Sequence, residues 1–324
     1  MIAPSNTFNS PIAGAVMFKL TQIKSLRLQK PLGHNSQAHL SAASGLVKIG
    51  KWLFIVADDE KHLVVFDSTD NSAGIAHRIM HGDLPQDSEA RKKHKHDFEA
   101  ITLLPSNKQC PQGGLLILGS GSKKQREQGV LVPFLSAVMD TQTPTLGETQ
   151  LLDLDPIYDA LKDEPGKTNI EGAIIQGKHI VLFQRGNKNN CNAIIEFNCK
   201  DFLAAALGEK KPSLNYSIHP LDLGAIDAVP LCFTDATALS DGRLIFTAAA
   251  EDTEDAYRDG ACLGSAIGLI SNTYELISIT RVDKPVKLEG IALDEEASAL
   301  KLWLVSDPDN AQLPGELYVA QLNA

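Results

Sequence analysis

The hydrophobic and polar positions of the chain repeat one short pattern at long intervals. In each copy an acidic residue precedes Ala or Gly and then an apolar run, as in Phe98 to Leu103. The residue before the Ala or Gly serves as the reference, which gives Ser44, Glu99, Glu171, Asp235 and Glu289, with Ser44 as a degenerate first copy. These residues are separated by 55, 72, 64 and 54 positions. Such intervals are typical of a repeat architecture, in which insertions account for the longer ones.

Each reference residue is followed by two short hydrophobic strands joined by a polar turn, and then by a more polar strand. In the first repeat these strands are Trp52 to Ala57, His62 to Phe66 and Ala73 to Met80. Runs rich in β-branched and aromatic residues between polar turns are typical of antiparallel hairpins. The fifth repeat ends after Glu316 to Ala320 and lacks a fourth strand, so we expect Phe18 to Leu28 to supply it.

Five repeats of four strands predict an all-β fold, a five-bladed β-propeller whose last blade is closed by an N-terminal strand. A six-bladed ring with one degenerate blade is the alternative. We expect a single domain over residues 17–324, preceded by a loose tail over residues 1–16. Short helices are expected at Ile157 to Lys162 and at Asp201 to Leu207, inside the loops that lengthen two repeats.

The composition is that of an ordinary globular chain, with 43% hydrophobic and 22% charged residues. The formal net charge of −10 argues against a nucleic-acid partner, because phosphate neutralisation needs a broad Lys/Arg surface. No segment indicates a membrane span or a secretory signal. Five cysteines without metal-site spacing indicate free thiols in a reducing compartment, so we expect a cytoplasmic protein.

The five reference residues carry the candidate chemistry, because the first strand of each propeller blade lines the central channel. Their side chains would then converge, and four carboxylates at close range require protons or a bound cation. Oxygen ligands favour a hard ion such as Ca²⁺, whereas the absence of His and Cys at these positions argues against zinc. The alternative is that the carboxylates accept backbone N–H bonds or hold channel water.

The loops between the second and third strands should emerge on the face at which the inner strands begin. Basic and amide groups gather on two of these loops, at Lys123, Lys124, Arg126, Arg185 and Asn187. We predict that they bind a small anionic substrate held by the central ion. For Gly119 to Lys124, which lacks the residue order of a P-loop, a solvated turn is the alternative.

Two histidines precede the inner strand of the second repeat. His94 or His96 is a candidate general base at the mouth of the channel, because the unperturbed pKa of histidine lies near neutrality. An exposed basic loop over Arg91 to Asp97 is the alternative. The chain has no Gly-x-Ser-x-Gly nucleophile elbow, no glycine-rich dinucleotide turn and no His-Glu-x-x-His motif.

The repeated Glu-Ala/Gly pattern resembles the inner strands of calcium-containing propellers: the apyrases (calcium-activated nucleotidases), the gluconolactonase and paraoxonase group, and the esterase-like phytases. The order Ser44, Glu99, Glu171, Asp235, Glu289 is similar to the apyrase ring of glutamates and hydroxyl residues around a central calcium, with Asp235 in place of an expected hydroxyl residue. Gly119 to Ser122 is also similar to a segment of uncharacterised bacterial propellers. The resemblance implies a calcium cofactor.

These observations predict a soluble propeller with a central Ca²⁺-like ion that hydrolyses a small anionic substrate, either a phosphate ester or an anhydride. A metal-dependent lactonase or esterase, with His94 or His96 as its base, is the second enzymatic alternative. The alternative from another class is a non-catalytic propeller that binds a ligand or a partner protein and uses the ion as a structural element, since propellers host both kinds of function.

Overall fold

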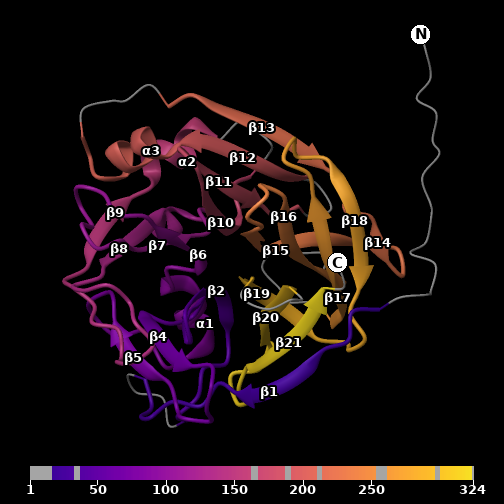
Figure 1. Cartoon of the computed structure of the whole chain (residues 1–324), viewed down its shortest axis with the longest axis horizontal. Helices are drawn as coiled ribbons and strands as arrows, with labels where there is room; N and C mark the ends of the chain where they lie inside the picture. Colours follow the sequence, from indigo (N-terminus) through magenta and orange to yellow (C-terminus); the bar gives the residue numbers. More distant parts are fainter. Residues whose placement is uncertain are drawn as a thin grey trace.

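The computed structural model describes residues 17–32, 37–161, 167–186, 191–209, 214–252, 261–295 and 300–322. The predicted tail over residues 1–16 and the predicted anion ligand Asn187 lie outside these ranges. The described residues form five antiparallel sheets arranged as the blades of a ring (Figure 1). The prediction of five blades is therefore confirmed over the six-bladed alternative.

The strands of blades 1 to 4 follow one another outward from the axis of the ring in chain order. Blade 1 contains β2 (Ala43–Ile49), β3 (Trp52–Ala57), β4 (His62–Asp67) and β5 (Ile75–Arg78). Blade 2 contains β6 (Phe98–Leu104), β7 (Gly114–Gly119), β8 (Gln128–Pro133) and β9 (Gln150–Asp153). Blade 3 contains β10 (Ile170–Gln176), β11 (His179–Gln184), β12 (Asn192–Asn198) and β13 (Tyr216–Leu221). Blade 4 contains β15 (Val229–Ala238), β16 (Leu244–Asp252), β17 (Ala261–Ile270) and β18 (Leu276–Arg281), with the short β14 (Ala225–Ile226) beside β15.

Blade 5 is closed by the N-terminal segment, as the missing fourth strand predicted. It contains β19 (Lys287–Asp294), β20 (Leu300–Asp307), β21 (Glu316–Leu322) and, outermost, β1 (Thr21–Ser25). In the antiparallel pair of β1 and β21, Gln22 lies opposite Tyr318. Beyond β1, Leu28 bridges to Gly74 of blade 1, so this segment joins the last blade to the first.

The core lies between adjacent blades, because the middle strands are buried on both faces. Between blades 1 and 2 it includes Phe54, Val65, Ile117 and Val132, and equivalent clusters fill the other interfaces. The helices α2 (Asp155–Ala160) and α3 (Cys199–Ala206) cover the outside of blades 2 and 3 and confirm the two predicted helices to within two residues at each end.

One helix, α1 (Ser88–His94), was not predicted. The side chain of Asp87 caps it by accepting the N–H of Ala90 at 2.8 Å, and basic residues occupy its last turn, where they favour the negative end of the helix dipole. No helix among the described residues is long and apolar enough to cross a membrane. The five cysteines are free thiols.

Candidate functional site

A β-bulge in each inner strand builds the site. The inner strands β2, β6, β10, β15 and β19 each pack on their neighbours around the axis, and each slips by one residue against the second strand of its own blade. The slips fall at Ser44, Glu99, Glu171, Thr234 and Glu289. A bulged residue is left out of the strand ladder, which lets its side chain turn toward a site.

The repeat therefore placed four of the five reference residues at equivalent positions and missed the fifth by one residue. Thr234 occupies the bulge of blade 4, whereas Asp235 lies one position farther along the strand and is buried. The carboxylate of Asp235 accepts the N–H of Ala236 at 2.8 Å and the N–H of Ile291 on β19 at 2.9 Å. Burial raises the pKa of Asp235, and these N–H bonds oppose the shift. Asp235 thus links the inner strands β15 and β19 by hydrogen bonds.

Glu289 is paired with an ammonium group of its own strand. Lys287 Nζ lies 2.9 Å from Glu289 Oε1, 2.9 Å from Glu251 Oε1, 3.0 Å from Asp309 Oδ1 and 3.8 Å from Asp307 Oδ2. Burial raises the pKa of Glu289 to about 8, against the opposing charges of Lys287 and then Arg185. Lys287 therefore supplies positive charge where the sequence predicted an ion.

Glu171 is held in a similar way. Arg185 Nη1 lies 3.2 Å from Glu171 Oε2, and its Nη2 lies 2.6 Å from Glu251 Oε2. Asn169 donates a further hydrogen bond of 2.6 Å to Glu171 Oε1. Both terminal nitrogens of Arg185, which was predicted to clamp an anion, are thus engaged by carboxylates. Opposite charges alternate from Glu171 through Arg185 and Glu251 to Lys287.

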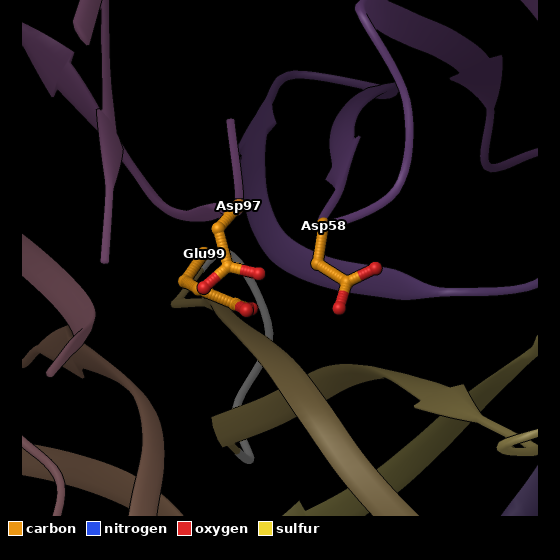
Figure 2. Close-up of side chains that lie close together, drawn as sticks. All are labelled: Asp58, Asp97 and Glu99. Atoms are coloured by element: carbon orange, nitrogen blue, oxygen red, sulfur yellow. The ribbon is translucent and has the colours of Figure 1, made fainter. Parts of the chain in front are cut away.

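A second group of carboxylates lies at the junction of blades 1 and 2. One carboxylate oxygen from each of Asp58, Asp97 and Glu99 lies within 4.8 Å of the others (Figure 2). Asp58 follows the second strand of blade 1, whereas Asp97 and Glu99 lie at the start of the inner strand of blade 2. The contacts in both groups confirm that the loops after the second strands and the starts of the inner strands share one face.

The three carboxylates differ in how they are compensated. Lys95 Nζ pairs with Asp58 and lies 2.8 Å from Asp97 Oδ1. Asp97 Oδ2 also receives Arg126 Nη1 at 2.6 Å and the hydroxyl of Ser120 at 2.6 Å. The carboxylate of Glu99 makes no hydrogen bond or ion pair within the described ranges. Burial, followed by the nearby charges of Glu171, Asp97 and Asp58, raises the pKa of Glu99 well above its ordinary value.

Together these groups form what we call the axial cluster: Asp58, Asp97, Glu99, Glu171, Glu251, Glu289, Asp307 and Asp309, with Lys95, Arg126, Arg185 and Lys287. Eight carboxylates thus face four cations. Buried charges of one sign are costly unless compensated, so the cluster favours proton uptake or the binding of a further cation.

The structure does not bring the predicted histidines to the axial cluster. His94 lies exposed on α1, with its Nδ1 2.7 Å from the carbonyl oxygen of Ala90. The ring of His96 stacks on Phe98, and its Nδ1 lies 3.3 Å from the carbonyl oxygen of Gln125. Burial lowers the pKa of His96, with Lys61 acting in the same direction.

The remaining predicted residues take other positions. Lys124 is 72% exposed and pairs with Asp155 and with Glu127, which are not part of the axial cluster. It begins the 3₁₀ turn Lys124–Arg126, which Lys123 precedes. Arg126 is buried on Asp97. The hydroxyl of Ser44 donates to the carbonyl oxygen of Ala42 and accepts the N–H of Asp58, both at 3.1 Å.

The sequence reasoning missed the cations Lys95 and Lys287. For Lys287 a signal was present, because residues at i and i+2 of a strand share one face, and Lys287 stands two residues before Glu289. Lys95 gives no comparable signal, since it reaches Asp58 of another blade from the end of a helix.

Comparison with known proteins gives one family match. Residues 39–322 match a family described as "Family of unknown function (DUF6929)". No curated protein matches the sequence.

Several solved structures resemble the fold at low identity. Luciferin-regenerating enzyme is 12% identical with a TM-score of 0.44, over 87% of this chain and 92% of that one. Streptogramin B lyase is 12% identical with a TM-score of 0.41, over 94% and 88%. A chain of a nidogen/laminin complex is 11% identical with a TM-score of 0.40, over 89% and 88%.

Proposed function

We propose a function from the axial cluster, because the chain belongs to DUF6929, a family of unknown function. In this proposal the propeller holds a Ca²⁺-like ion between Asp58, Asp97 and Glu99, and through that ion it binds and hydrolyses a small phosphate ester or anhydride. The observation that carries the proposal is the approach of three carboxylates from two blades to within 4.8 Å. A cytoplasmic location belongs to the same proposal.

The donor set fits a hard cation. All three side chains offer carboxylate oxygens, which Ca²⁺ and Mg²⁺ prefer, and the group contains no His or Cys that would favour zinc. The ring of five ligands predicted from the sequence fits less well, because Arg185 and Lys287 already compensate Glu171 and Glu289. The proposed ion is therefore displaced from the axis toward blades 1 and 2.

The protein groups around this position have separate roles. Arg126 and the hydroxyl of Ser120 orient Asp97, and Glu99, whose carboxylate makes no hydrogen bond within the described ranges, supplies an oxygen ligand that no other group holds. Lys95 competes with the ion for Asp58 and Asp97 and thereby limits its affinity. A bound divalent ion would polarise a phosphoryl oxygen and lower the pKa of a water molecule. Of the predicted anion contacts, Arg126 and Arg185 lie within the axial cluster, where both are paired with carboxylates.

A non-catalytic propeller is the second candidate, and one observation favours it. The ion pairs of Arg185 and Lys287 already connect blades 3, 4 and 5, as a structural staple would. The lactonase or esterase alternative lacks support at the axial cluster, because the contacts of His94 and His96 lie elsewhere.

Calorimetric titration of chelator-treated protein tests the proposal. Ca²⁺, Mg²⁺ and Mn²⁺ are titrated into the wild type, Glu99→Gln and the control Glu289→Gln, each variant removing one carboxylate of the axial cluster. We expect binding that collapses in Glu99→Gln and persists in Glu289→Gln. Silence of all three ions in the wild type would refute the metal site. Turnover of phosphate esters or nucleotides that requires the ion separates the enzyme from the non-catalytic propeller.

A further inference from the structure

A cavity of about 350 Å³ lies on the rim of blade 1, far along the blade from the axis. It opens between the outermost strand β5 and the segment Gln29 to Leu32 that follows the closing strand. The two backbones are joined just before it, where Gly74 N–H donates to Arg27 at 2.8 Å and Gln29 N–H donates to Gly74 at 3.1 Å. Beyond that point Pro31 has no N–H to continue the pairing, and the backbones part around the cavity.

Glycine at position 74 makes this close approach feasible. A Cβ there would lie 2.6 Å from ring atoms of Phe66 and 2.7 Å from a methyl group of Val64. Any larger residue would push β5 away from β4 or from the closing segment. The cavity is therefore a consequence of how the ring is closed: the segment Gln29 to Leu32 forms one wall and blade 1 forms the other.

The walls of the cavity are basic in an acidic protein. Lys30, His62 and Arg78 line it, and none of its described lining residues carries a carboxylate, although the chain has a net charge of −10. His62 and Arg78 lie opposite each other on β4 and β5, so their side chains share a face of the sheet. Arg78 is held in place by bonds of 2.8 Å to the carbonyl of Gly82 and 2.7 Å to Asp83. Within the described residues these bonds use two of its five N–H groups.

His62 is the group that points to a ligand. It is only 9% exposed, and its buried Nδ1 makes no hydrogen bond within the described part of the chain. Its Nδ1 lies 3.4 Å from Glu60 Oε2. A buried imidazole is stabilised by hydrogen bonds, and a carboxylate in the cavity would accept one from its Nε2.

The remaining lining includes four aliphatic residues beside Gln29 and Gly74. Leu32, which is 6% exposed, and Ile75 face the cavity together with Pro31 and Ala76. A volume of about 350 Å³ lies at the lower end of the range for ligand pockets, which suits a small molecule. We propose that this rim cavity binds a small organic anion with an apolar body, such as a medium-chain carboxylate. The proposal is independent of the function proposed for the axial cluster.

Such a ligand would hold the closing segment to blade 1. Its carboxylate would accept hydrogen bonds from Arg78 and His62 on the blade and from Lys30 on the segment, while its chain lies on Leu32 and Ile75. Because a ligand that binds only the folded state stabilises it, occupancy should raise the melting temperature of the whole propeller.

Octanoate serves as the probe, in calorimetric titration and in thermal melting of the full-length protein. Acetate tests the need for the apolar body, and inorganic phosphate tests the alternative anion. Arg78→Gln and Lys30→Gln remove cavity charge. The matched control is Arg243→Gln, because Arg243 is also exposed and pairs with Asp241 at 2.7 Å, but lies on blade 4.

We expect saturable octanoate binding with a higher melting temperature, and an affinity about tenfold weaker in Arg78→Gln, as expected for loss of a charge-assisted hydrogen bond. Lys30→Gln should weaken binding as well, and Arg243→Gln should leave it unchanged. Absence of octanoate binding in the wild type would overturn the proposal. Equal affinity in Arg78→Gln and Arg243→Gln, or binding of phosphate without octanoate, would also overturn it.

Discussion

Replacement of Lys287 by Met tests whether the axial cluster depends on its internal cations. Methionine keeps most of the side-chain volume and removes the ammonium group. Glu251, Glu289, Asp307 and Asp309 would then lose their shared partner, while Glu251 would keep its ion pair with Arg185. Removing one partner of a buried ion pair costs about 3–5 kcal/mol, because the opposite charge stays buried and uncompensated. This loss is a large fraction of the stability of a typical domain.

The loss should depend on pH in a direction set by the carboxylates. The pKa of Glu289 is raised from 4.5 to about 8 even beside Lys287, and the pKa of Asp307 is also raised by burial. A group whose pKa is higher in the folded state than in the unfolded state contributes stability that is lost as the pH rises through its folded-state pKa. Without Lys287 these pKa values rise further, so the deficit of the variant should be largest above about pH 8 and should shrink toward about pH 5.

Urea unfolding, followed by the fluorescence of Trp303 and Trp52, measures this effect at about pH 5, 7 and 9. The control is Lys124→Met, because Lys124 also has two carboxylate partners but is exposed, and its loss should change the free energy of unfolding little. A deficit for Lys287→Met below about 1 kcal/mol at about pH 9, or one that is the same at every pH, would refute the buried ion-pair cluster.

Three further predictions concern the fold. Gly268→Ala should lower the free energy of unfolding by about 1–3 kcal/mol in urea titration, because the added methyl group would overlap the ring of Phe246. Leu26→Ala should lower it by about 2–5 kcal/mol, since Leu26 is fully buried, and a loss near zero would exclude the closing segment from the cooperative core. The lowered pKa of His96 predicts stability that falls as the pH drops below 6.5, so His96→Gln should flatten the acid side of a melting-temperature profile.

The propeller could be predicted because crowding at the axis leaves a trace in the sequence. An added Cβ at Gly45 would lie 2.9 Å from the backbone oxygen of Glu99, and one at Gly172 would lie 3.1 Å from the Cα of Asp235. Small residues therefore recur beside each bulge. Because each inner strand carries such a small residue, the number of these positions along the chain gives the number of blades.

The error at Asp235 has a physical cause in the same region. Thr234, Asp235 and Ala236 fit the repeat in two registers, and the acidic residue was chosen as the reference. The register is decided by the bulge, which arises from the backbone hydrogen bonds between β15 and β16. A bulge of this kind requires no particular residue type, so the sequence does not show where it lies. Asp235 then occupies the position that Gly172 holds in blade 3.

The charge balance of the axial cluster could not be predicted from the sequence. Repetition placed the acidic residues, but their cationic partners follow no repeat: Lys95 comes from the end of a helix, Arg185 follows a second strand, and Lys287 begins an inner strand. Tertiary contacts show that Glu171 and Glu289 have close cationic partners, whereas Glu99 makes no ion pair within the described ranges. For this reason the ion is proposed beside Glu99, between Asp58 and Asp97.

The closing strand also has a consequence for how the chain folds during synthesis. Gln22 of β1 pairs with Tyr318, so nearly 300 residues must be translated before β1 meets its partner. At about 5–20 residues per second this wait lasts roughly 15–60 seconds. Each of the first four blades is contiguous in sequence and can pair locally, whereas the final contact has the highest contact order in the ring. Until β21 has left the ribosome, the nascent chain should therefore carry its blades in an open arc.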